Sequence, residues 1–214
     1  MKYWQSLTIS FKTFLRLAFF LWFVGLISCF LLPKFDIHHS LNSFHTRFLD
    51  LFFSGITFLG DGVFAVILAL IFFIKNKTQG IQLLLTFLIS ALLAQLLKNF
   101  VFADFMRPYY YIQSGQIHVP IIEGVKMHTS HSFPSGHTTT IFAITSMLSS
   151  FYPSKIMGFS LFLIAVLVGY SRIYLSQHFL EDALLGSFIG VFTSYTIGLY
   201  FRKKRSINNN STYN

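Results

Sequence analysis

Charged residues are scarce in this sequence. Only 11% of the 214 residues are Asp, Glu, Lys or Arg, whereas 54% are hydrophobic and 19% are aromatic. Soluble domains usually carry roughly 25% charged residues, and disordered chains are poor in hydrophobic residues. The composition therefore excludes both classes, and the mean hydropathy of +0.62 indicates an integral membrane protein.

Cysteine and acidic residues are scarce too. The single cysteine, Cys29, lies inside an apolar run, which excludes a disulfide framework and a cysteine metal cluster. Seven acidic residues stand against 16 Lys and Arg, for a net charge of +9. In a multi-pass membrane protein such basicity usually orients the chain, so we expect no nucleic-acid partner. The length leaves room for a single membrane domain, residues 1–214, without a large soluble domain.

Six segments are long and apolar enough to cross a bilayer, whose core of about 30 Å needs roughly 20 helical residues. We predict an all-α bundle of six transmembrane helices near residues 15–32, 55–74, 81–97, 135–152, 156–172 and 182–201. Between the first two, apolar residues recur at helical spacing and predict a helix lying in the membrane interface: Leu41, Phe44, Phe48, Leu49 and Phe52. Asp61 interrupts the second segment, where we expect a structural hydrogen bond.

The basic residues also predict the orientation, because Lys and Arg accumulate on the cytoplasmic side. With six spans both termini share a side, which collects Lys2, Lys12, Arg16, Lys75, Lys77, Lys155, Arg202, Lys203, Lys204 and Arg205. We therefore place both termini in the cytoplasm. We read the run Arg202–Arg205 as an anchor that contacts anionic lipids, and residues 203–214 as a disordered cytoplasmic tail.

Residues 26–29 loosely resemble a lipoprotein processing site. However, the apolar run continues through Leu32, and no typical cleavage site follows it. We therefore expect the first helix to be retained, with Cys29 as a small apolar core residue.

Ionisable residues near a bilayer are costly unless they are paired or used. In the predicted topology the third and fifth helices end, and the fourth and sixth begin, on the non-cytoplasmic side. Six such residues therefore meet at one membrane face: Lys98, Arg107, His137, Arg172, His178 and Asp182. This meeting point is the candidate site.

The cations of this set favour a phosphate. Lys98, Arg107 and Arg172 lack a comparable number of acidic partners, and guanidinium groups match the oxygens of a phosphate. The fourth helix opens with Pro-Ser-Gly-His, and a helix N-terminus favours an anion. Gly136 permits close approach of the backbone and the Ser135 hydroxyl adds a donor. We predict that these five residues bind the phosphoryl group.

The two histidines favour covalent phosphoryl transfer. His178 and Asp182 are four residues apart, which places them on one face of a helix. The carboxylate then accepts the Nδ1 proton and leaves Nε2 free to attack phosphorus. We assign His178 as the nucleophile, Asp182 as the residue that orients it, and His137 as the general acid that later accepts a proton from water.

The motifs that carry these residues resemble the type 2 phosphatidic acid phosphatase (PAP2) superfamily of membrane lipid phosphatases over about residues 55–200. The sequence shows Lys98…Arg107-Pro108, then Pro134-Ser135-Gly136-His137, then Ser171-Arg172-x5-His178-x3-Asp182. The resemblance implies a six-helix bundle, phosphohistidine chemistry, no metal or other cofactor, and the same site residues. One departure stands out: eight residues separate Lys98 from Arg107, where the family commonly has six. This leaves open whether Lys98 contacts the phosphate.

We therefore predict a lipid phosphatase whose partners are the bilayer and a lipid phosphate. Its substrate is a monoester or diphosphate, and the candidates are polyprenyl diphosphate, phosphatidylglycerol phosphate, phosphatidic acid and lipid A phosphates. The small size favours a bacterial enzyme of the inner (cytoplasmic) membrane, with its active site on the periplasmic side. A lipid-to-lipid phosphotransferase and a non-catalytic anion-binding membrane protein are the alternatives, and the oligomeric state is open.

The loop of residues 109–133 lies between two signature segments and is the natural place for headgroup selection. Its tyrosines are expected to anchor the chain at the membrane interface. A metal site at His128, His131 and His137 is the alternative for its histidines, but the spacing is irregular and the loop lacks cysteine.

Overall fold

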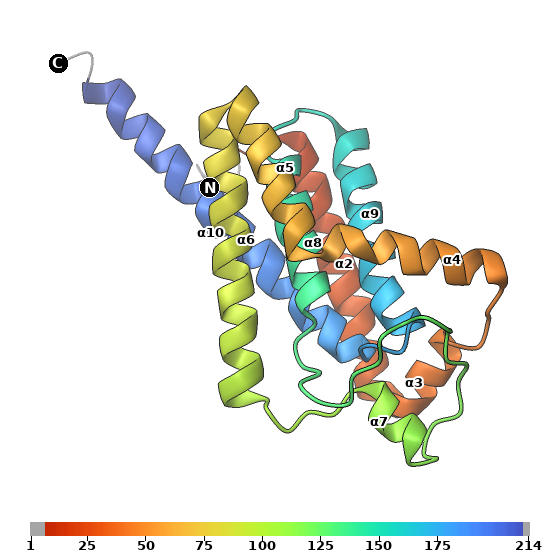
Figure 1. The fold of residues 1–214 in the computed structure, drawn as a ribbon. Coiled ribbons are helices and arrows are strands. Elements are labelled where there is room, and N and C mark those ends of the chain that lie inside the picture. Colours follow the sequence, from red (N-terminus) through yellow and green to blue (C-terminus); the bar gives the residue numbers. More distant parts are fainter. Residues whose placement is uncertain (1–6, 212–214) are drawn as a thin grey trace.

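The computed structural model describes residues 7–211, and the side chains of residues 7–204. The described residues form helices and no strand (Figure 1). The elements in chain order are α2 (Ile9–Leu31), α3 (Lys34–Leu41), α4 (Arg47–Ile56), the 3₁₀ turn η1 (Thr57–Gly60), α5 (Gly62–Lys75), α6 (Lys77–Leu96), the π turn η2 (Leu97–Val101), α7 (Pro108–Gln113), α8 (Gly136–Ser149), α9 (Lys155–Tyr174) and α10 (Leu180–Ser211).

The membrane-spanning helices confirm a multi-pass, all-α membrane protein. Four helices of the described chain are long and apolar enough to cross a bilayer: Ile9–Leu31, Lys77–Val101, Lys155–Tyr174 and Leu180–Lys204. A pair bent by 57°, Arg47–Gly60 with Gly62–Lys75, adds a fifth at most. The predicted span 135–152 is α8, which has 14 residues, fewer than the roughly 20 that cross a bilayer. The count of six therefore remains a prediction.

Helix α8 is short and lies at the centre of the bundle. All of its residues from Thr138 to Ser149 are buried, so it packs against other helices on every side. Two glycines let α10 approach its backbone closely. A Cβ on Gly186 would lie 2.6 Å from the Ser135 carbonyl oxygen, and one on Gly190 would lie 2.5 Å from the Thr139 carbonyl oxygen. Small residues allow such close helix packing in membranes, and here they hold the start of α8 against the start of α10.

The predicted interfacial helix is two helices, α3 and α4, separated by residues 42–46. Figure 1 shows α4 projecting sideways across the direction of the bundle. It buries Phe53, whose ring lies 4.5 Å from that of Tyr174, and it exposes Phe48 (74%) and Leu51 (68%). This amphipathic character is typical of a helix in the membrane interface. After the break, Thr46 caps the N-terminus of α4, and its side chain accepts a hydrogen bond from the Leu49 N–H.

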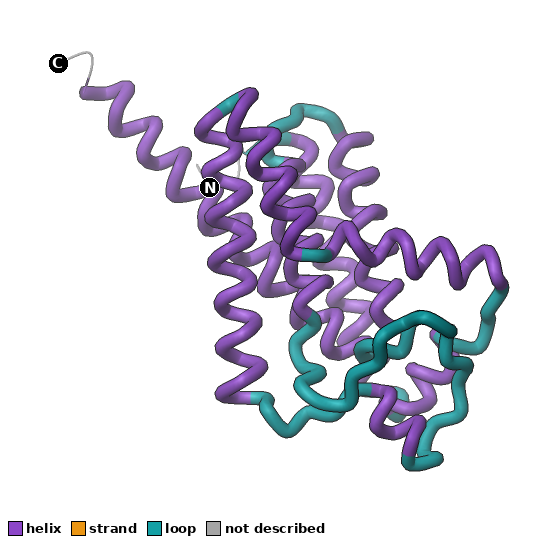
Figure 2. The backbone as a smooth tube through the Cα atoms, in the orientation of Figure 1, coloured by secondary structure: helices purple, strands orange, loops and turns teal. Residues whose placement is uncertain are grey.

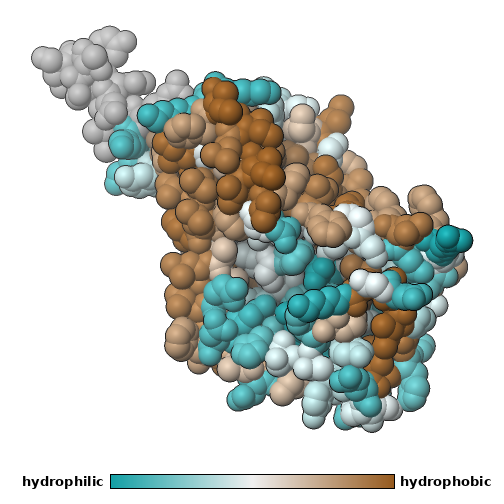
Figure 3. Space-filling view, in the orientation of Figure 1, coloured by the Kyte–Doolittle hydropathy of each residue, from teal (hydrophilic) through white to brown (hydrophobic). Residues whose placement is uncertain are grey.

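The loops are distributed unevenly over the two ends of the bundle. The long connection from α6 to α8 gathers at one end with α3 and α7, whereas the connections α5–α6 and α8–α9 at the other end are short (Figure 2). Figure 3 shows hydrophilic side chains over the loop-rich end and hydrophobic ones along the visible helices. Helix α10 continues to Ser211, so the first part of the predicted disordered tail 203–214 is helical. Residues 212–214 lie outside the described residues.

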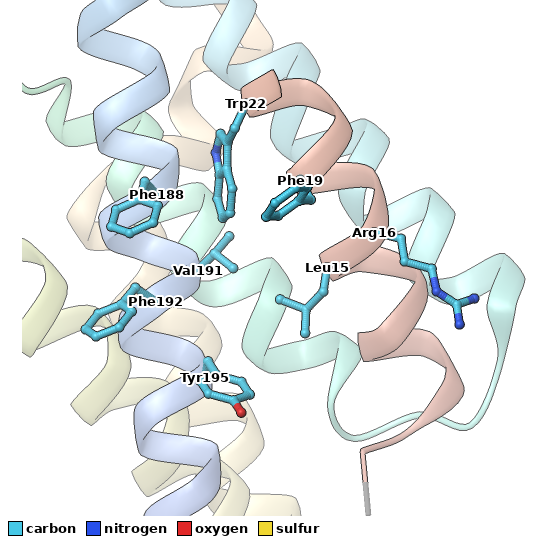
Figure 4. Close-up of a pocket in the computed structure, with 8 residues that line it drawn as sticks. All are labelled: Leu15, Arg16, Phe19, Trp22, Phe188, Val191, Phe192 and Tyr195. Carbon is cyan, nitrogen blue, oxygen red and sulfur yellow. The ribbon is translucent and has the colours of Figure 1, made fainter. Parts of the chain in front are cut away.

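A groove of about 610 Å³ on the flank of the bundle separates α2 from α10. Its walls are apolar and mostly aromatic, and they include Phe19 and Trp22 of α2 and Phe188 and Phe192 of α10 (Figure 4). The indole N–H of Trp22 donates to the Ser187 hydroxyl at 2.8 Å, which joins the two helices. None of the predicted site residues lines this groove, so it is not the predicted site.

Candidate active site

A cavity of about 760 Å³ opens at the loop-rich end of the bundle. Six of the predicted site residues line it: Lys98, Arg107, Gly136, His137, Arg172 and His178. They come from η2, the following loop, α8, the end of α9 and the turn before α10. Residues far apart in the sequence thus meet around one cavity, as the topology predicts.

The imidazole of His178 lies between the carboxylate of Asp182 and the guanidinium of Arg107. Its Nδ1 lies 3.2 Å from Oδ2 of Asp182, and its Nε2 lies 3.4 Å from Nη1 of Arg107. Since a guanidinium can only donate, these partners assign the proton to Nδ1 and the free lone pair to Nε2. Burial, then the positive charges of Arg107, Arg172 and Lys98, holds the pKa of His178 well below its ordinary value. The ring is therefore neutral, and Nε2 keeps the free lone pair that a nucleophile requires.

Asp182 does not line the cavity but lies behind the histidine and is fully buried. Its Oδ2 also accepts hydrogen bonds from the Phe179 N–H at 2.9 Å and from the hydroxyl of Ser132. Ser132 was not among the predicted residues, because its contact depends on the folding of the loop before α8. These donors fix the carboxylate that orients the imidazole.

Arg172, the last basic residue of α9, is 8% exposed. Its Nη1 donates to the hydroxyl of Thr57 at 2.6 Å, which joins α9 to the turn η1. Its Nε–H has no partner among the described residues. A buried guanidinium with a free donor is suited to an anion with several oxygens.

Arg107 is surrounded by carbonyl groups. Its Nε donates to the Ser130 carbonyl at 2.9 Å, its Nη1 to the Gln177 carbonyl at 3.2 Å, and its Nη2 to the His131 carbonyl at 3.4 Å. Burial lowers the pKa of Arg107, which still leaves a guanidinium charged at neutral pH. These bonds point the side chain at His178.

Lys98 lines the same cavity despite the longer spacing to Arg107. The chain leaves α6 through the π turn η2, Leu97–Val101, which includes Lys98. A π turn takes up more residues than an α turn, so part of the additional length is absorbed within the helix. Despite the longer spacing, Lys98 therefore lines the same cavity as Arg107 and Arg172.

The start of α8 is divided between cavity and core. Gly136 and His137 line the cavity, and a Cβ on Gly136 would meet no described atom within 4 Å. Ser135 is fully buried and caps the helix: its hydroxyl accepts from the Thr138 hydroxyl at 2.9 Å and from the Thr138 N–H at 3.4 Å. Ser135, which we predicted to donate to the phosphate, does not line the cavity. Gly136 does line it, and the space next to its Cα is open.

The remaining expectations concern Asp61, the loop and a metal. Asp61 lines the cavity, and its Oδ1 accepts the Val63 N–H at 2.8 Å, which caps α5. From the loop 109–133, Glu123, Lys126 and His128 reach the cavity. No group of three or more His, Cys, Asp or Glu that could hold a metal ion occurs in the described part of the chain, so the alternative metal site has no structural support.

The chain matches known proteins over most of its length. The model of the PAP2 superfamily matches residues 79–206. Phosphatidylglycerophosphatase B of Bacillus subtilis is 29% identical over 158 residues, which cover 67% of this chain and 71% of that protein. Lipid A 4′-phosphatase of Porphyromonas gingivalis is 28% identical over 174 residues, which cover 77% and 72%.

The fold is similar as well. The crystal structure of Aquifex aeolicus LpxE aligns with a TM-score of 0.67 at 30% identity, over 78% of this chain and 94% of that chain. The family match spans more than half of the chain and contains every residue of the predicted site. The chain therefore belongs to the PAP2 superfamily and is a phosphate-ester hydrolase.

Proposed function

We propose that the protein hydrolyses a phosphate monoester or diphosphate on a membrane lipid, through a phosphohistidine at His178. The observation that carries this proposal is the arrangement of His178, whose Nδ1 is bonded to Asp182 while Nε2 faces a cavity with three cations. Phosphoryl transfer to an imidazole requires a neutral ring, a fixed orientation of that ring, and positive charge already in place around the phosphate.

In the first step the substrate phosphate takes the hydrogen bond that Arg107 gives to Nε2. The Nε2 lone pair then forms a bond to phosphorus as the bond from phosphorus to the leaving oxygen breaks. His137 donates a proton to that oxygen. The Nδ1 proton stays on His178, where Asp182 stabilises the positive ring.

In the second step water attacks phosphorus and His137 takes its proton. The N–P bond breaks, inorganic phosphate leaves, and both histidines return to their starting forms. Lys98, Arg107 and Arg172 offset the charge on the phosphoryl oxygens in both steps.

A lipid substrate is supported by the wall of the cavity. Leu51 of α4 and Phe58 of η1 line it, yet they are 68% and 69% exposed. The wall is therefore continuous with the apolar outer surface, so a lipid presents its phosphate while its tails stay in the bilayer. Phosphatidylglycerol phosphate and lipid A phosphates are candidates because relatives carry those names, beside polyprenyl diphosphate and phosphatidic acid.

We place the catalytic end on the periplasmic face of a bacterial inner membrane, with both termini in the cytoplasm. The basic residues support this orientation. The end opposite the cavity holds the end of α5 and the starts of α6 and α9 (Figure 1), and these helix ends are Lys75, Lys77 and Lys155. A site on the outer face acts on lipids of the outer leaflet of that membrane.

Phosphate release from a panel of these lipids, by purified protein with a chelator present, tests the proposal. We expect release by the wild type and none by His178→Ala. His118→Ala is the matched control, since His118 is an exposed loop histidine outside the cavity, and it should behave as the wild type. Equal release by His178→Ala would contradict the proposal, and a second lipid added as acceptor separates hydrolysis from transfer.

A further inference from the structure

Gln177 directly precedes the nucleophile, and its side chain is buried, with 2% exposure of the residue. Burying an amide is unfavourable unless both of its ends find hydrogen-bond partners. In the family signature this position is one of the five unspecified residues between Arg172 and His178. The signature therefore assigns Gln177 no role, and its hydrogen bonds are the evidence for one.

The backbone around Gln177 is fixed by the end of α9. Ser176 is in the left-handed region with a φ of 51°. The Ser176 N–H donates to the Ile173 carbonyl and the Gln177 N–H to the Arg172 carbonyl, both at 2.9 Å. These two bonds form a Schellman motif. The turn therefore fixes where the side chain of Gln177 leaves the backbone.

The two ends of the Gln177 amide contact different parts of the site. Its Oε1 lies 3.5 Å from Nη1 of Arg107, the same nitrogen that donates to the Gln177 carbonyl at 3.2 Å. Its Nε2 donates to the Lys126 carbonyl at 3.2 Å and lies 3.2 Å from Sδ of Met127. One amide thus joins the cation beside the nucleophile to the loop over the cavity.

We propose that Gln177 is a positioning residue for phosphoryl transfer, which acts through Arg107 and rests on the function proposed above. Arginine has a long side chain with many rotamers. The Gln177 oxygens hold Nη1 of Arg107 3.4 Å from Nε2 of His178, so the cation is in place before phosphate binds. The bond to Lys126 keeps the loop residues Lys126 and His128 at the rim of the cavity.

The test compares two substitutions at Gln177 with a control. Gln177→Leu has a similar size and removes both polar ends, whereas Gln177→Glu keeps an acceptor for Arg107 and loses the donor to Lys126. The control is Gln116→Leu, because Gln116 is exposed in the loop 109–133 and its side chain donates to the Ser114 hydroxyl, away from the cavity. Each protein is assayed for kcat and KM, for inhibition by orthovanadate as a phosphate analogue, and for its melting temperature.

We expect Gln177→Leu to lower kcat/KM and the affinity for orthovanadate by about tenfold, with the melting temperature close to that of the control. The effect should depend on Arg107. In an Arg107→Lys background, the same substitution should change the orthovanadate affinity by less than about threefold. An equal loss in both backgrounds, or an unchanged orthovanadate affinity, would overturn the proposal.

The remaining outcomes are also decisive. If Gln177→Leu does not fold, Gln177→Glu takes its place: the added carboxylate should pair with Arg107 and weaken orthovanadate binding, and an unchanged affinity would overturn the proposal. If the wild type binds orthovanadate but releases no phosphate, hydrolysis is overturned while the role of Gln177 is still measured. If the wild type neither binds orthovanadate nor releases phosphate, both proposals fall.

Discussion

At the scale of single residues, the two arginines of the cavity donate hydrogen bonds to neutral oxygens. Arg172 donates to the Thr57 hydroxyl, and Arg107 donates to three backbone carbonyls. Neutral acceptors fix a guanidinium without cancelling its charge, whereas a carboxylate would compete with the substrate phosphate. The site therefore keeps its positive charge for the ligand.

Thr57 provides a direct test of this arrangement. Thr57→Val has a similar shape but no acceptor, so it leaves Nη1 of the buried Arg172 without its partner. We expect a loss of about 1–3 kcal/mol in stability, together with lower affinity for phosphate. Thermal unfolding in detergent and a phosphate inhibition assay measure the two effects. Thr57→Ser keeps the hydroxyl and should resemble the wild type, and equal behaviour of both variants would contradict the role of the hydroxyl.

The pH dependence of the activity belongs to the same scale. The pKa of His178 lies well below its ordinary value of 6.5 because of burial and neighbouring cations. The ring therefore stays neutral as the pH falls through 6.5, and the acid limb of kcat/KM that it causes should lie below that pH. Arg107→Gln removes one cation, raises this pKa and should move the limb to higher pH. An acid limb that stays in place in Arg107→Gln, measured as a pH–rate profile, would contradict this assignment.

At the scale of elements, the turn after α9 sets the distance between two signature residues. Arg172 belongs to the last turn of α9, and its carbonyl accepts both the Gln177 and the His178 N–H groups, at 2.9 and 3.1 Å. The motif requires a left-handed residue, which is Ser176 here. The spacing between Arg172 and His178 is thus the length of this helix ending, and the turn brings the backbone of His178 back to the carbonyl of Arg172.

Substitutions of Ser176 should separate the backbone requirement from the side chain. Ser176→Gly adopts the left-handed region freely and loses only the contact of the hydroxyl with His38, at 3.3 Å. We expect it to retain most of the activity. Ser176→Val puts a β-branched residue where φ is positive and should lower kcat/KM by more than about tenfold. Similar activity of the two variants would show that the turn tolerates other conformations.

The long apolar segments were predictable because each reads as a helix by itself. The helices α2, α6, α9 and α10 correspond to the predicted spans. Their ends differ because hydropathy does not mark caps such as Thr8 or Asn76, and α10 continues ten residues beyond its predicted end. The centre of the bundle was less predictable. The length of α8 and the break between α3 and α4 depend on their neighbours in the fold, which a hydropathy pattern does not contain.

The site shows the same division. The residues that carry charge or chemistry, such as His178 and Arg172, were predictable because their types are rare in a membrane span. Thr57, Ser132 and Gln177 were missed since each is an ordinary polar residue, and only tertiary structure brings it to a charged group. Ser135 was assigned to phosphate as a donor; its hydroxyl caps α8 as an acceptor, and its contact with phosphate stays a prediction.

At the scale of the whole molecule, the orientation in the membrane decides which lipids meet the site. Single cysteines in a Cys29→Ser background test it: Thr78→Cys in the short-loop end and Gln116→Cys in the long loop, both at exposed positions. We expect a membrane-impermeant maleimide to label Gln116→Cys in intact spheroplasts and Thr78→Cys only after lysis. The Cys29→Ser chain without a new cysteine is the control, and the reverse pattern would contradict the orientation.

The exposed wall formed by Leu51 and Phe58 also has a kinetic consequence. If the substrate reaches the cavity from within the bilayer, its effective concentration is its mole fraction in the membrane and not its concentration in the suspension. Diluting the lipid phosphate with an inert lipid at constant bulk amount should therefore slow the reaction. Adding more vesicles of the same composition should leave the turnover rate unchanged. The enzyme then responds to the composition of a surface.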